Sequence, residues 1–254
     1  MLIRSTWTLK VDAPTTLPKS YRLEMSKHLH SLAGLEVGGA AMPNTTFSGL
    51  QGRTQYADGF VTLQPDEFYQ LSLSGLQKNV SKAIASLELS DTLELLGARL
   101  KVIDRVDDTT SYEALYHRYV ADEPEPERQI TLSFPAPTAF SQQRTYLPLP
   151  VPTLMLRSWL ERWNEFAPVY LGKDDLIGYL GETVVLSRHR IQTQAFPIHK
   201  GMVSGFTGTI TLSVLQRGDS LLAQVANLLT HYAQFSGTGI KTRLGMGQTV
   251  IQAP

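Results

Sequence analysis

The segment Ser236–Gln248, with the sequence SGTGIKTRLGMGQ, most constrains how this chain folds. It follows a predicted amphipathic helix (residues 219–235) and precedes an apolar strand (residues 249–251). Glycine accepts positive φ and lets another backbone approach closely, so the segment predicts a tight helix-to-strand connection. Exposed N–H groups beside Lys241 and Arg243 would also suit phosphate oxygens, and both interpretations stay open. The glycines concerned are Gly237, Gly239, Gly245 and Gly247.

Two better-known phosphate-binding motifs do not match this segment. A P-loop requires a Gly-Lys-Ser/Thr ending that opens a following helix, and none is present. A dinucleotide fingerprint requires a strand before the glycines and a helix after them, which is the reverse of the predicted order.

The composition predicts a folded protein and narrows its chemistry. Hydrophobic residues make up 42% of the 254 residues and charged residues 18%, which is enough for a buried core. Lys and Arg equal Asp and Glu at 23 each, so a nucleic-acid binder must cluster its cations locally. The absence of cysteine excludes disulfides, thiol catalysis and cysteine zinc sites. Without a long apolar run or a signal-peptide pattern, we expect a soluble, cytoplasmic protein.

The pattern of elements repeats on either side of the acidic, proline-rich stretch ADEPEPER. This stretch, residues 121–128, predicts a linker between an N-terminal domain (1–122) and a C-terminal domain (129–254). Each half approximates the order β-α-β-β-α-β of a ferredoxin-like domain. Predicted helices cover residues 21–33, 77–87, 153–166 and 219–235. In the N-terminal half, a long strand over residues 93–106 is expected to form a hairpin with residues 112–120.

Several stretches resemble the CRISPR-associated endoribonucleases that cut repeat RNA, the sixth Cas family of the RAMP superfamily. The match begins with the glycine-rich segment and extends to ITLSFPAPTAFSQQRTYLPLP, LRSWLERWNEF and GMVSGFTGTITLSV. These stretches span most of the C-terminal half, whereas the N-terminal half matches more loosely. The resemblance implies an α+β protein of two tandem ferredoxin-like (RRM-like) domains, each with an antiparallel sheet and two helices. It also implies CRISPR repeat RNA as the partner.

The histidine pattern gives little support for a metal site. The six histidines include no His-x-x-x-His or His-Glu-x-x-His arrangement, so we expect no metal. His28 and His30 stand two residues apart on the first predicted helix, which turns their side chains to different sides. At most one of them is therefore expected to face a site.

The resemblance implies a catalytic group near the end of that first helix. In the family, a histidine after a leucine at this point often acts in cleavage, and Leu29-His30 matches best, with His28 as runner-up. The family also often uses a tyrosine in the helix and a nearby lysine. Tyr21 and Lys27 occupy that neighbourhood. Because no lysine follows His30 before Arg53, the charge-stabilising role passes to Lys27, Arg22 or Arg53.

A second basic cluster lies in SRHRIQTQAFPIHKG. It predicts either a solvated β-ribbon or an RNA-gripping hairpin that contacts phosphates. We favour the hairpin because the cluster is dense in a chain whose net charge is zero. Its candidate residues are Arg188, His189, Arg190, His199 and Lys200. Trp159 and Trp163 stand four apart on a predicted helix with apolar neighbours, which favours core packing over base stacking.

Three hypotheses follow. The first is a metal-independent, cofactor-free endoribonuclease that binds a repeat stem-loop and cuts precursor crRNA, leaving 5′-hydroxyl and 2′,3′-cyclic phosphate ends. The second is a catalytically silent RAMP protein that binds RNA within an effector complex. The third is an unrelated soluble α+β domain without tight RNA binding. Other Cas proteins and a homodimer are candidate partners, and no membrane is expected.

Overall fold

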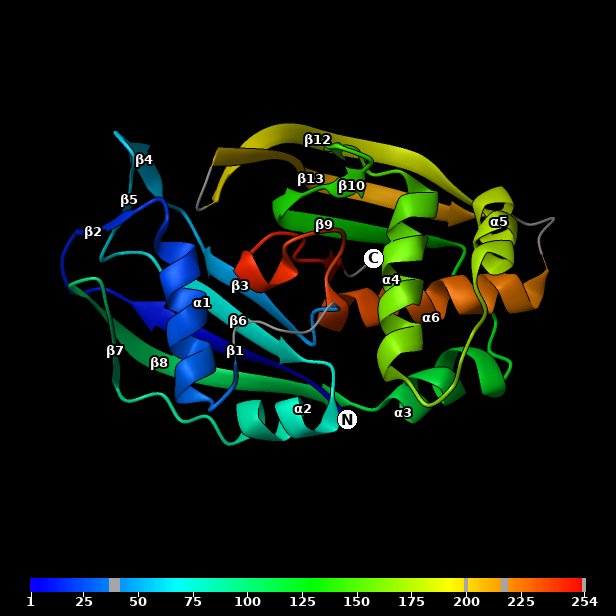
Figure 1. Cartoon of the computed structure of the whole chain (residues 1–254), viewed down its shortest axis with the longest axis horizontal. Coiled ribbons are helices and arrows are strands. Elements are labelled where there is room, and N and C mark those ends of the chain that lie inside the picture. The colour runs from blue at the N-terminus through cyan, green and yellow to red at the C-terminus, as the bar shows by residue number, and fades with distance from the viewer. Residues whose placement is uncertain (37–41, 199–200, 216–218, 253–254) are drawn as a thin grey trace.

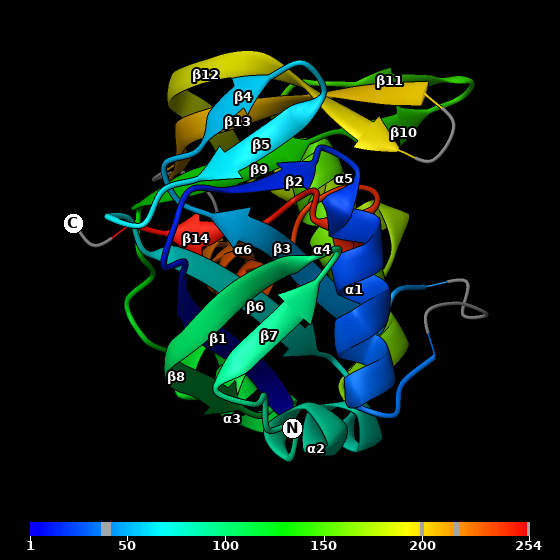
Figure 2. The same ribbon diagram turned by 90° about the vertical axis from the view of Figure 1, so that its left-hand side faces the viewer.

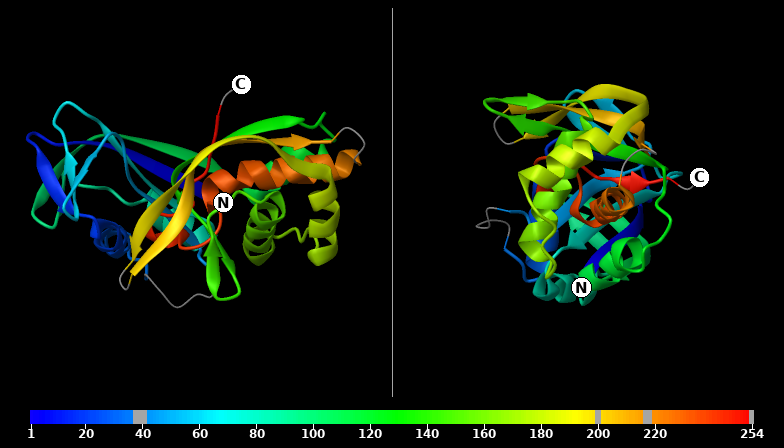
Figure 3. Two further views of the ribbon diagram at one scale, coloured as in Figure 1. Left: turned by 90° about the horizontal axis from the view of Figure 1, so that it is seen from above. Right: turned by 90° about the vertical axis from the view of Figure 1, so that its right-hand side faces the viewer.

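Each half of the chain forms an antiparallel sheet. Of the four strands in the ferredoxin-like order β-α-β-β-α-β, the first lies between the third and the fourth in each sheet. The computed structural model describes residues 1–36, 42–198, 201–215 and 219–252. Figure 1 shows the two halves side by side, and Figure 3 shows them from above and from the end. The sequence-based prediction of two tandem ferredoxin-like folds with antiparallel sheets is therefore confirmed.

The N-terminal sheet has the order β3-β6-β1-β8-β7. Burial alternates along β1, with Ile3, Trp7 and Leu9 turned to the core and Lys10 outward, which is the period of a half-buried strand. A separate three-stranded sheet has the order β2-β5-β4. The elements are β1 (Leu2–Lys10), β2 (Thr15–Pro18), α1 (Tyr21–Leu32), β3 (Thr45–Gln51), β4 (Gln55–Ala57), β5 (Phe60–Leu63), β6 (Tyr69–Gly75), α2 (Lys78–Ala85), β7 (Thr92–Leu95) and β8 (Ala98–Thr110).

The C-terminal sheet has the order β12-β13-β9-β14, and β12 and β13 form a long hairpin. Helix α6 is nearly surrounded by protein, and the Asp219 side chain caps it by accepting the N–H of Leu221 at 2.9 Å. The elements are β9 (Gln129–Thr138), β10 (Phe140–Gln142), β11 (Thr145–Leu147), α4 (Pro152–Phe166), α5 (Asp174–Thr183), β12 (Val184–Ile198), β13 (Gly201–Val214), α6 (Ser220–Ser236), the 3-10 turn η2 (Thr242–Leu244) and β14 (Val250–Ile251).

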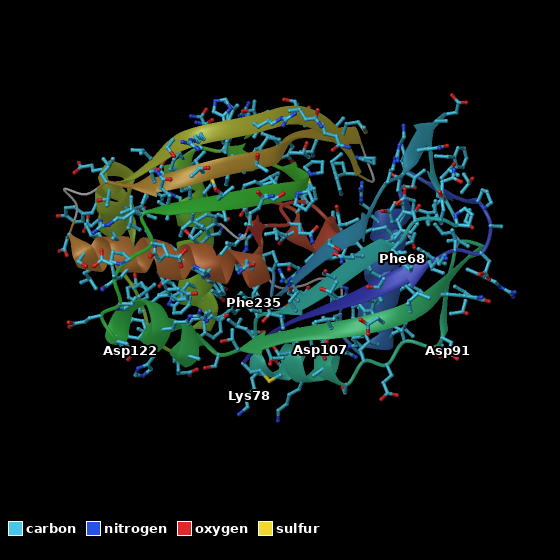
Figure 4. All side chains as sticks on the ribbon, turned by 180° about the vertical axis from the view of Figure 1, so that it is seen from behind. Phe68, Lys78, Asp91, Asp107, Asp122 and Phe235 are labelled. Carbon is cyan, nitrogen blue, oxygen red and sulfur yellow. The ribbon has the colours of Figure 1, made fainter. Side chains whose placement is uncertain are left out.

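Helices α1 and α2 cover one face of the N-terminal sheet. The view from behind shows the opposite face without a helix over it, with β8 and β1 toward the viewer (Figure 4). Among the described residues, no helix is long and apolar enough to cross a membrane.

Two large apolar cores hold the halves, and the second of them crosses the boundary between the halves. One core lies between the N-terminal sheet and its helices and includes Trp7, Tyr21 and Leu29. The other surrounds α4 and α6, and it also takes in Leu2 and Leu76 from the N-terminal half. The halves are thus joined by packed side chains as well as by the chain itself.

The acidic stretch between the halves is held against α6. Asn227 accepts the N–H of Glu127 at 2.7 Å and donates to its carbonyl at 3.0 Å, and Gln224 donates to the carbonyl of Pro124 at 2.9 Å. His231 bonds the Glu127 carboxylate at 2.9 Å. Hydrogen bonds at four points therefore fix the course of this connection.

The expected strand over residues 112–120 is wrong. These residues form α3 (Tyr112–Tyr116) and a π-helical turn, η1 (His117–Ala121). Ser111 starts the helix by accepting the N–H of Ala114 at 3.0 Å. Tyr112 then packs edge-on against Trp163, with 5.1 Å between ring centroids, so contacts with the C-terminal half stabilise the helix.

Two other departures concern the long strand and a helix. The single strand expected over residues 93–106 is a hairpin, because Leu96 and Gly97 both adopt positive φ (50° and 82°) and turn the chain between β7 and β8. Strand β12 begins at Val184, directly after α5, which occupies the preceding residues. Helix α5 was not predicted from the sequence.

Candidate functional site

The glycine loop, residues 237–248, lies between α1 of the N-terminal half and α4 of the C-terminal half (Figures 1 and 2). Backbone hydrogen bonds fix it. Thr238 N–H donates to Gly247 O at 2.8 Å and closes the loop, while Gly247 N–H donates to Pro137 O at 3.0 Å. Ile240 N–H donates to Ala139 O, also at 3.0 Å. The loop is therefore attached to the end of β9.

Glycine is required in this loop for both conformation and space. Gly239 and Gly247 have φ of 77° and 72°, and a Cβ at either position would collide with a backbone carbonyl oxygen, of Ala139 and Thr238 respectively. Gly245 has φ of 98° and packs against the side chain of Arg22 and the backbone of β3. The need for a tight connection is therefore enough to explain why glycine occupies these positions, without any bound phosphate.

The N–H groups of three of these glycines are already occupied. Gly237 donates to Ala233 O, Gly239 to Ser158 Oγ and Gly247 to Pro137 O. A phosphate bound in this conformation would have to use other donors of the loop. Direct RNA contact by Gly237, Gly239, Gly245 and Gly247 stays a prediction.

The two cations of the loop lie in different surroundings. Lys241 adopts a left-handed backbone (φ 55°) and its ammonium lies 5.9 Å from the centre of the Tyr146 ring. Arg243 is half-buried, and burial lowers the pKa of its guanidinium. Its Nη2 donates to the carbonyl of Met42 at 3.4 Å. Both cations remain partly exposed to solvent beside the junction of the two halves.

One face of α1 is turned toward this loop. Arg22, Ser26 and His30 recur every four residues and so share that face. Ser26 Oγ donates to the carbonyl of Arg243 at 2.8 Å, which ties the helix directly to the loop. The structure thus brings His30 and Arg243 into one neighbourhood, although they are more than 200 residues apart in sequence.

His30 is fully buried, and hydrogen bonds engage both of its ring nitrogens. Nδ1 lies 2.7 Å from the carbonyl of Ser26, and because a carbonyl only accepts, Nδ1 carries the proton. Nε2 lies 2.9 Å from Thr45 Oγ1 and accepts from that hydroxyl in the neutral ring. Burial is the main cause that lowers the pKa of His30, and the charge of Arg243 lowers it further, against the bond to Ser26.

The other candidates on and near α1 are spread out. His28 is half-buried and, two residues from His30, lies on a different side of the helix. Lys27 is exposed and pairs with Glu24 at 2.9 Å. Tyr21 is buried, and its hydroxyl accepts the N–H of Leu50 at 3.2 Å. Arg53 follows the far end of β3 from Thr45, which places it roughly 20 Å from His30.

Arg22 connects α1 with two segments of the C-terminal half, strand β12 and the glycine loop. Its guanidinium lies 5.1 Å from the centre of the Phe196 ring on β12 and 5.5 Å from that of Tyr21. Its Nε is buried without a hydrogen-bond partner among the described residues. Arg22 is thus placed at the junction of α1, the hairpin and the glycine loop.

The basic hairpin prediction falls on an edge strand. Arg188, His189 and Arg190 are exposed on β12, which ends the sheet. A β-bulge between Leu186 and Arg188 shifts the register here. His199 and Lys200 lie outside the described residues. Across the described ranges, no three His, Asp or Glu side chains converge as a metal-binding group.

Sequence reasoning missed three residues that shape the site: Ser26, Thr45 and Arg162. Ser26 and Thr45 hold His30, but nothing in the sequence around either residue marks it as the partner of a histidine. Arg162 was detectable, because it interrupts the apolar side of a helix beside Trp159 and Trp163. Both tryptophans are fully buried, which confirms their predicted core role.

Comparison with known proteins finds similarity to CRISPR-associated proteins. The family model of the CRISPR-associated endoribonuclease Cas6 matches residues 132–249, from β9 through the glycine loop. The CRISPR-associated endoribonuclease Cas6 of Mycobacterium tuberculosis is 27% identical over 257 residues, which cover 99% of this chain and 78% of the relative. That of Streptococcus thermophilus is 32% identical over 126 residues, covering 48% of this chain and 50% of the relative.

Solved structures share the whole fold. A Cas6 product complex (TTHA0078) superposes with a TM-score of 0.75 at 20% identity and covers 100% of both chains. Thermus thermophilus Cas6 (TTHB231) gives a TM-score of 0.72 at 22% identity, covering 99% of this chain and 98% of that one. The likeness therefore extends over both ferredoxin-like halves.

Replacing Gly239 by alanine is expected to destabilise the protein more than replacing Gly34. Both residues adopt positive φ, 77° and 65°, but a Cβ at Gly34 meets open space whereas one at Gly239 meets Ala139 O. We expect Gly239→Ala to cost about 1–3 kcal/mol more in unfolding free energy than Gly34→Ala, as overpacking does. Urea denaturation of both variants measures the difference, and equal destabilisation would contradict the clash.

Proposed function

We propose that this chain is a CRISPR-associated endoribonuclease of the Cas6 family. It binds CRISPR repeat RNA and cleaves precursor crRNA by attack of the RNA's own 2′-hydroxyl. The observation that carries the proposal is the junction where α1 brings His30 to the cationic glycine loop. The family match includes that loop.

In the proposed reaction a base removes the proton from the 2′-hydroxyl next to the scissile phosphate. The oxygen attacks the phosphorus in line, and the bond to the 5′-oxygen of the next nucleotide breaks as that oxygen takes up a proton. The products are a 2′,3′-cyclic phosphate and a 5′-hydroxyl. The protein has to align the two oxygens, move protons and stabilise the negative charge that develops on the phosphate.

His30 is our candidate base. Burial lowers the pKa of His30, which keeps the imidazole neutral near pH 7. The Nδ1–H bond to Ser26 fixes the tautomer and leaves Nε2 as the basic nitrogen. Because Nε2 accepts from Thr45 in this structure, the RNA has to displace the Thr45 hydroxyl. His28 is the second candidate, and Tyr21 is the third.

Arg243 is the best-placed cation for the developing phosphate charge. Its charge acts on His30, and its carbonyl is bonded to the same helix. Lys27 lies one turn before His30 but is exposed and engaged with Glu24. The separation along β3 argues against Arg53 in this role and leaves it as a candidate for more distant RNA contact.

The RNA-binding surface that we propose joins the glycine loop with the β12 edge. Lys241, Arg188 and Arg190 are partly or fully exposed cations there, and His189 and Lys200 are further candidates. Positive charge along a shape-defined surface suits A-form RNA, which is recognised through its backbone and shape. Arg22 contributes to this surface by packing against Gly245 of the loop.

A silent RNA-binding subunit is the second candidate function. The full burial of His30, with both nitrogens bonded, favours it, since a catalytic group must touch the substrate. In either case we propose domains at residues 1–122 and 129–254, action in the cytoplasm, and other Cas proteins or a second copy as further partners. The N-terminal core supports the division, whereas the C-terminal core also takes in Leu2, Leu76 and Tyr112 of the N-terminal half.

Cleavage by His30→Ala is expected to be about a hundredfold slower or worse, the usual contribution of general acid–base catalysis. Affinity for the RNA should change little, because a neutral imidazole adds little to phosphate binding. His28→Ala is the matched control, with a smaller effect. Single-turnover assays on labelled repeat RNA in EDTA measure the rates. A 2′-deoxy nucleotide at the cut site should abolish cleavage, and a cleaved deoxy substrate would rule out the mechanism.

The acid limb of kcat/KM is expected below pH 6.5. The base works only when neutral, and because burial lowers the pKa of His30, protonation and loss of activity begin at a lower pH than for a free histidine. Arg243→Gln should move the limb to higher pH, since the Arg243 charge lowers the pKa of His30. If the acid limb of the profile lies above pH 6.5 and keeps the same midpoint in His30→Ala, another group is responsible for the titration.

Removing Arg188 and Arg190 together is expected to weaken RNA binding and to make it less salt-dependent. For each phosphate that the protein no longer neutralises, the slope of log K against log salt falls by about 0.9 for duplex and less for single strands. Arg99→Gln is the control, because Arg99 is exposed but pairs with Glu94 on the other half. Filter binding at four salt concentrations gives the slopes, and unchanged slopes would place the RNA elsewhere.

A further inference from the structure

Helix α4 holds the glycine loop from the side opposite α1. Ser158 Oγ accepts the N–H of Gly239 at 2.9 Å, and Arg162 Nη2 donates to the carbonyl of Gly239 at 2.5 Å. Trp159 Nε1 donates to Thr238 Oγ1 at 2.8 Å. Three neighbouring side chains of one helix therefore hold both backbone polar groups of Gly239 and the residue before it.

Arg162 is the unusual member of this group. It is 4% exposed, and none of the ion pairs among the described residues includes it. Its Nη1 donates to Ser158 Oγ at 2.6 Å and to Ser158 O at 3.3 Å, while its buried Nε has no partner in the described chain. Burying a guanidinium without a carboxylate is costly, so a purely structural position would favour an uncharged side chain.

The hydrogen bonds of the glycine loop indicate a role for the Arg162 guanidinium. Gly239 directs its carbonyl inward to Arg162, so the negative end of that peptide dipole is held away from any phosphate on the loop's outer side. Ile240 N–H is bonded to Ala139 O, and Lys241 follows at once in a left-handed conformation. The course of the chain into Lys241 and Arg243 thus starts from a segment that is fixed on two sides.

We propose that Arg162 is a positioning residue for RNA binding. It donates to the carbonyl of Gly239 and so fixes the glycine loop in the shape that presents Lys241 and Arg243. It also adds positive charge behind the surface that faces the phosphates. It does both without contacting the RNA. This inference rests on the proposed function.

The salt dependence of binding separates this role from direct contact. A residue that touches a phosphate lowers the slope of log K against log salt when it is removed, because it no longer releases a counterion. A buried positioning residue weakens binding and leaves the slope nearly unchanged. Direct contact is a real alternative, because Arg162 also lines a cavity of about 230 Å³ beside the loop, together with Phe140 and Ile240.

The experiment compares Arg162→Met, Arg162→Lys and the control Arg157→Met. Arg157 lies on the same helix and lines the same cavity, but its guanidinium pairs with Asp174 instead of bonding to the loop. Labelled repeat RNA is titrated at four salt concentrations, and cleavage is measured at saturating RNA. Thermal unfolding identifies variants that remain folded.

We expect Arg162→Met to weaken RNA binding roughly tenfold or more with an unchanged salt slope, as loss of a charge-assisted hydrogen bond does. KM should rise more than kcat falls. Arg162→Lys should recover part of the affinity, since it keeps the charge and one donor, and Arg157→Met should bind like the parent protein.

Three outcomes would overturn the inference: a folded Arg162→Met with parental affinity, a slope reduced by about one in Arg162→Met, or equally weakened binding in Arg157→Met. If Arg162→Met does not fold, Ser158→Ala and Arg162→Lys decide, and parental affinity in both rejects the role. Failure of the unmutated protein to bind repeat RNA would instead reject the proposed function.

Discussion

The hydrogen bond from Thr238 N–H to Gly247 O closes the loop on which the rest of the site depends. It forms only because no Cβ stands at Gly247, where one would collide with the carbonyl of Thr238. Once closed, the loop presents Arg243 and Gly245 to α1. It presents Thr238 and Gly239 to α4. The contacts of Ser26 with Arg243 and of Ser158 with Gly239 follow from that geometry.

The two halves share a strand order but have different tasks in the site. The N-terminal half contributes a helix whose side chains are held by its own strand β3, as the bond between His30 and Thr45 shows. The C-terminal half contributes backbone and cations from a loop and a hairpin. Arg22 stacks on Phe196 across the junction, so the position of the hairpin is coupled to that of α1.

Local patterns in the sequence were sufficient for much of the fold. The start of α1 at Tyr21, the helix after Pro152 and the glycine connection all depend on near neighbours in the chain. Residues 112–120 were mistaken for a strand, because aromatic residues favour strands. In the folded protein, Tyr112 instead packs against Trp163 and Tyr232 of the other half, and these contacts are distant in sequence. The state of His30 was also beyond prediction, because its burial depends on Thr45 and on a loop more than 200 residues away.

The core around α6 has a consequence for synthesis on the ribosome. Leu2, Leu76 and Tyr112 emerge early, yet their packing partners include side chains of α6, residues 220–236. At about 5–20 residues per second, the partners follow roughly 5 to 45 s later. During that interval the nascent N-terminal half has to keep an apolar patch in water, which makes it a natural client for a chaperone at the exit tunnel.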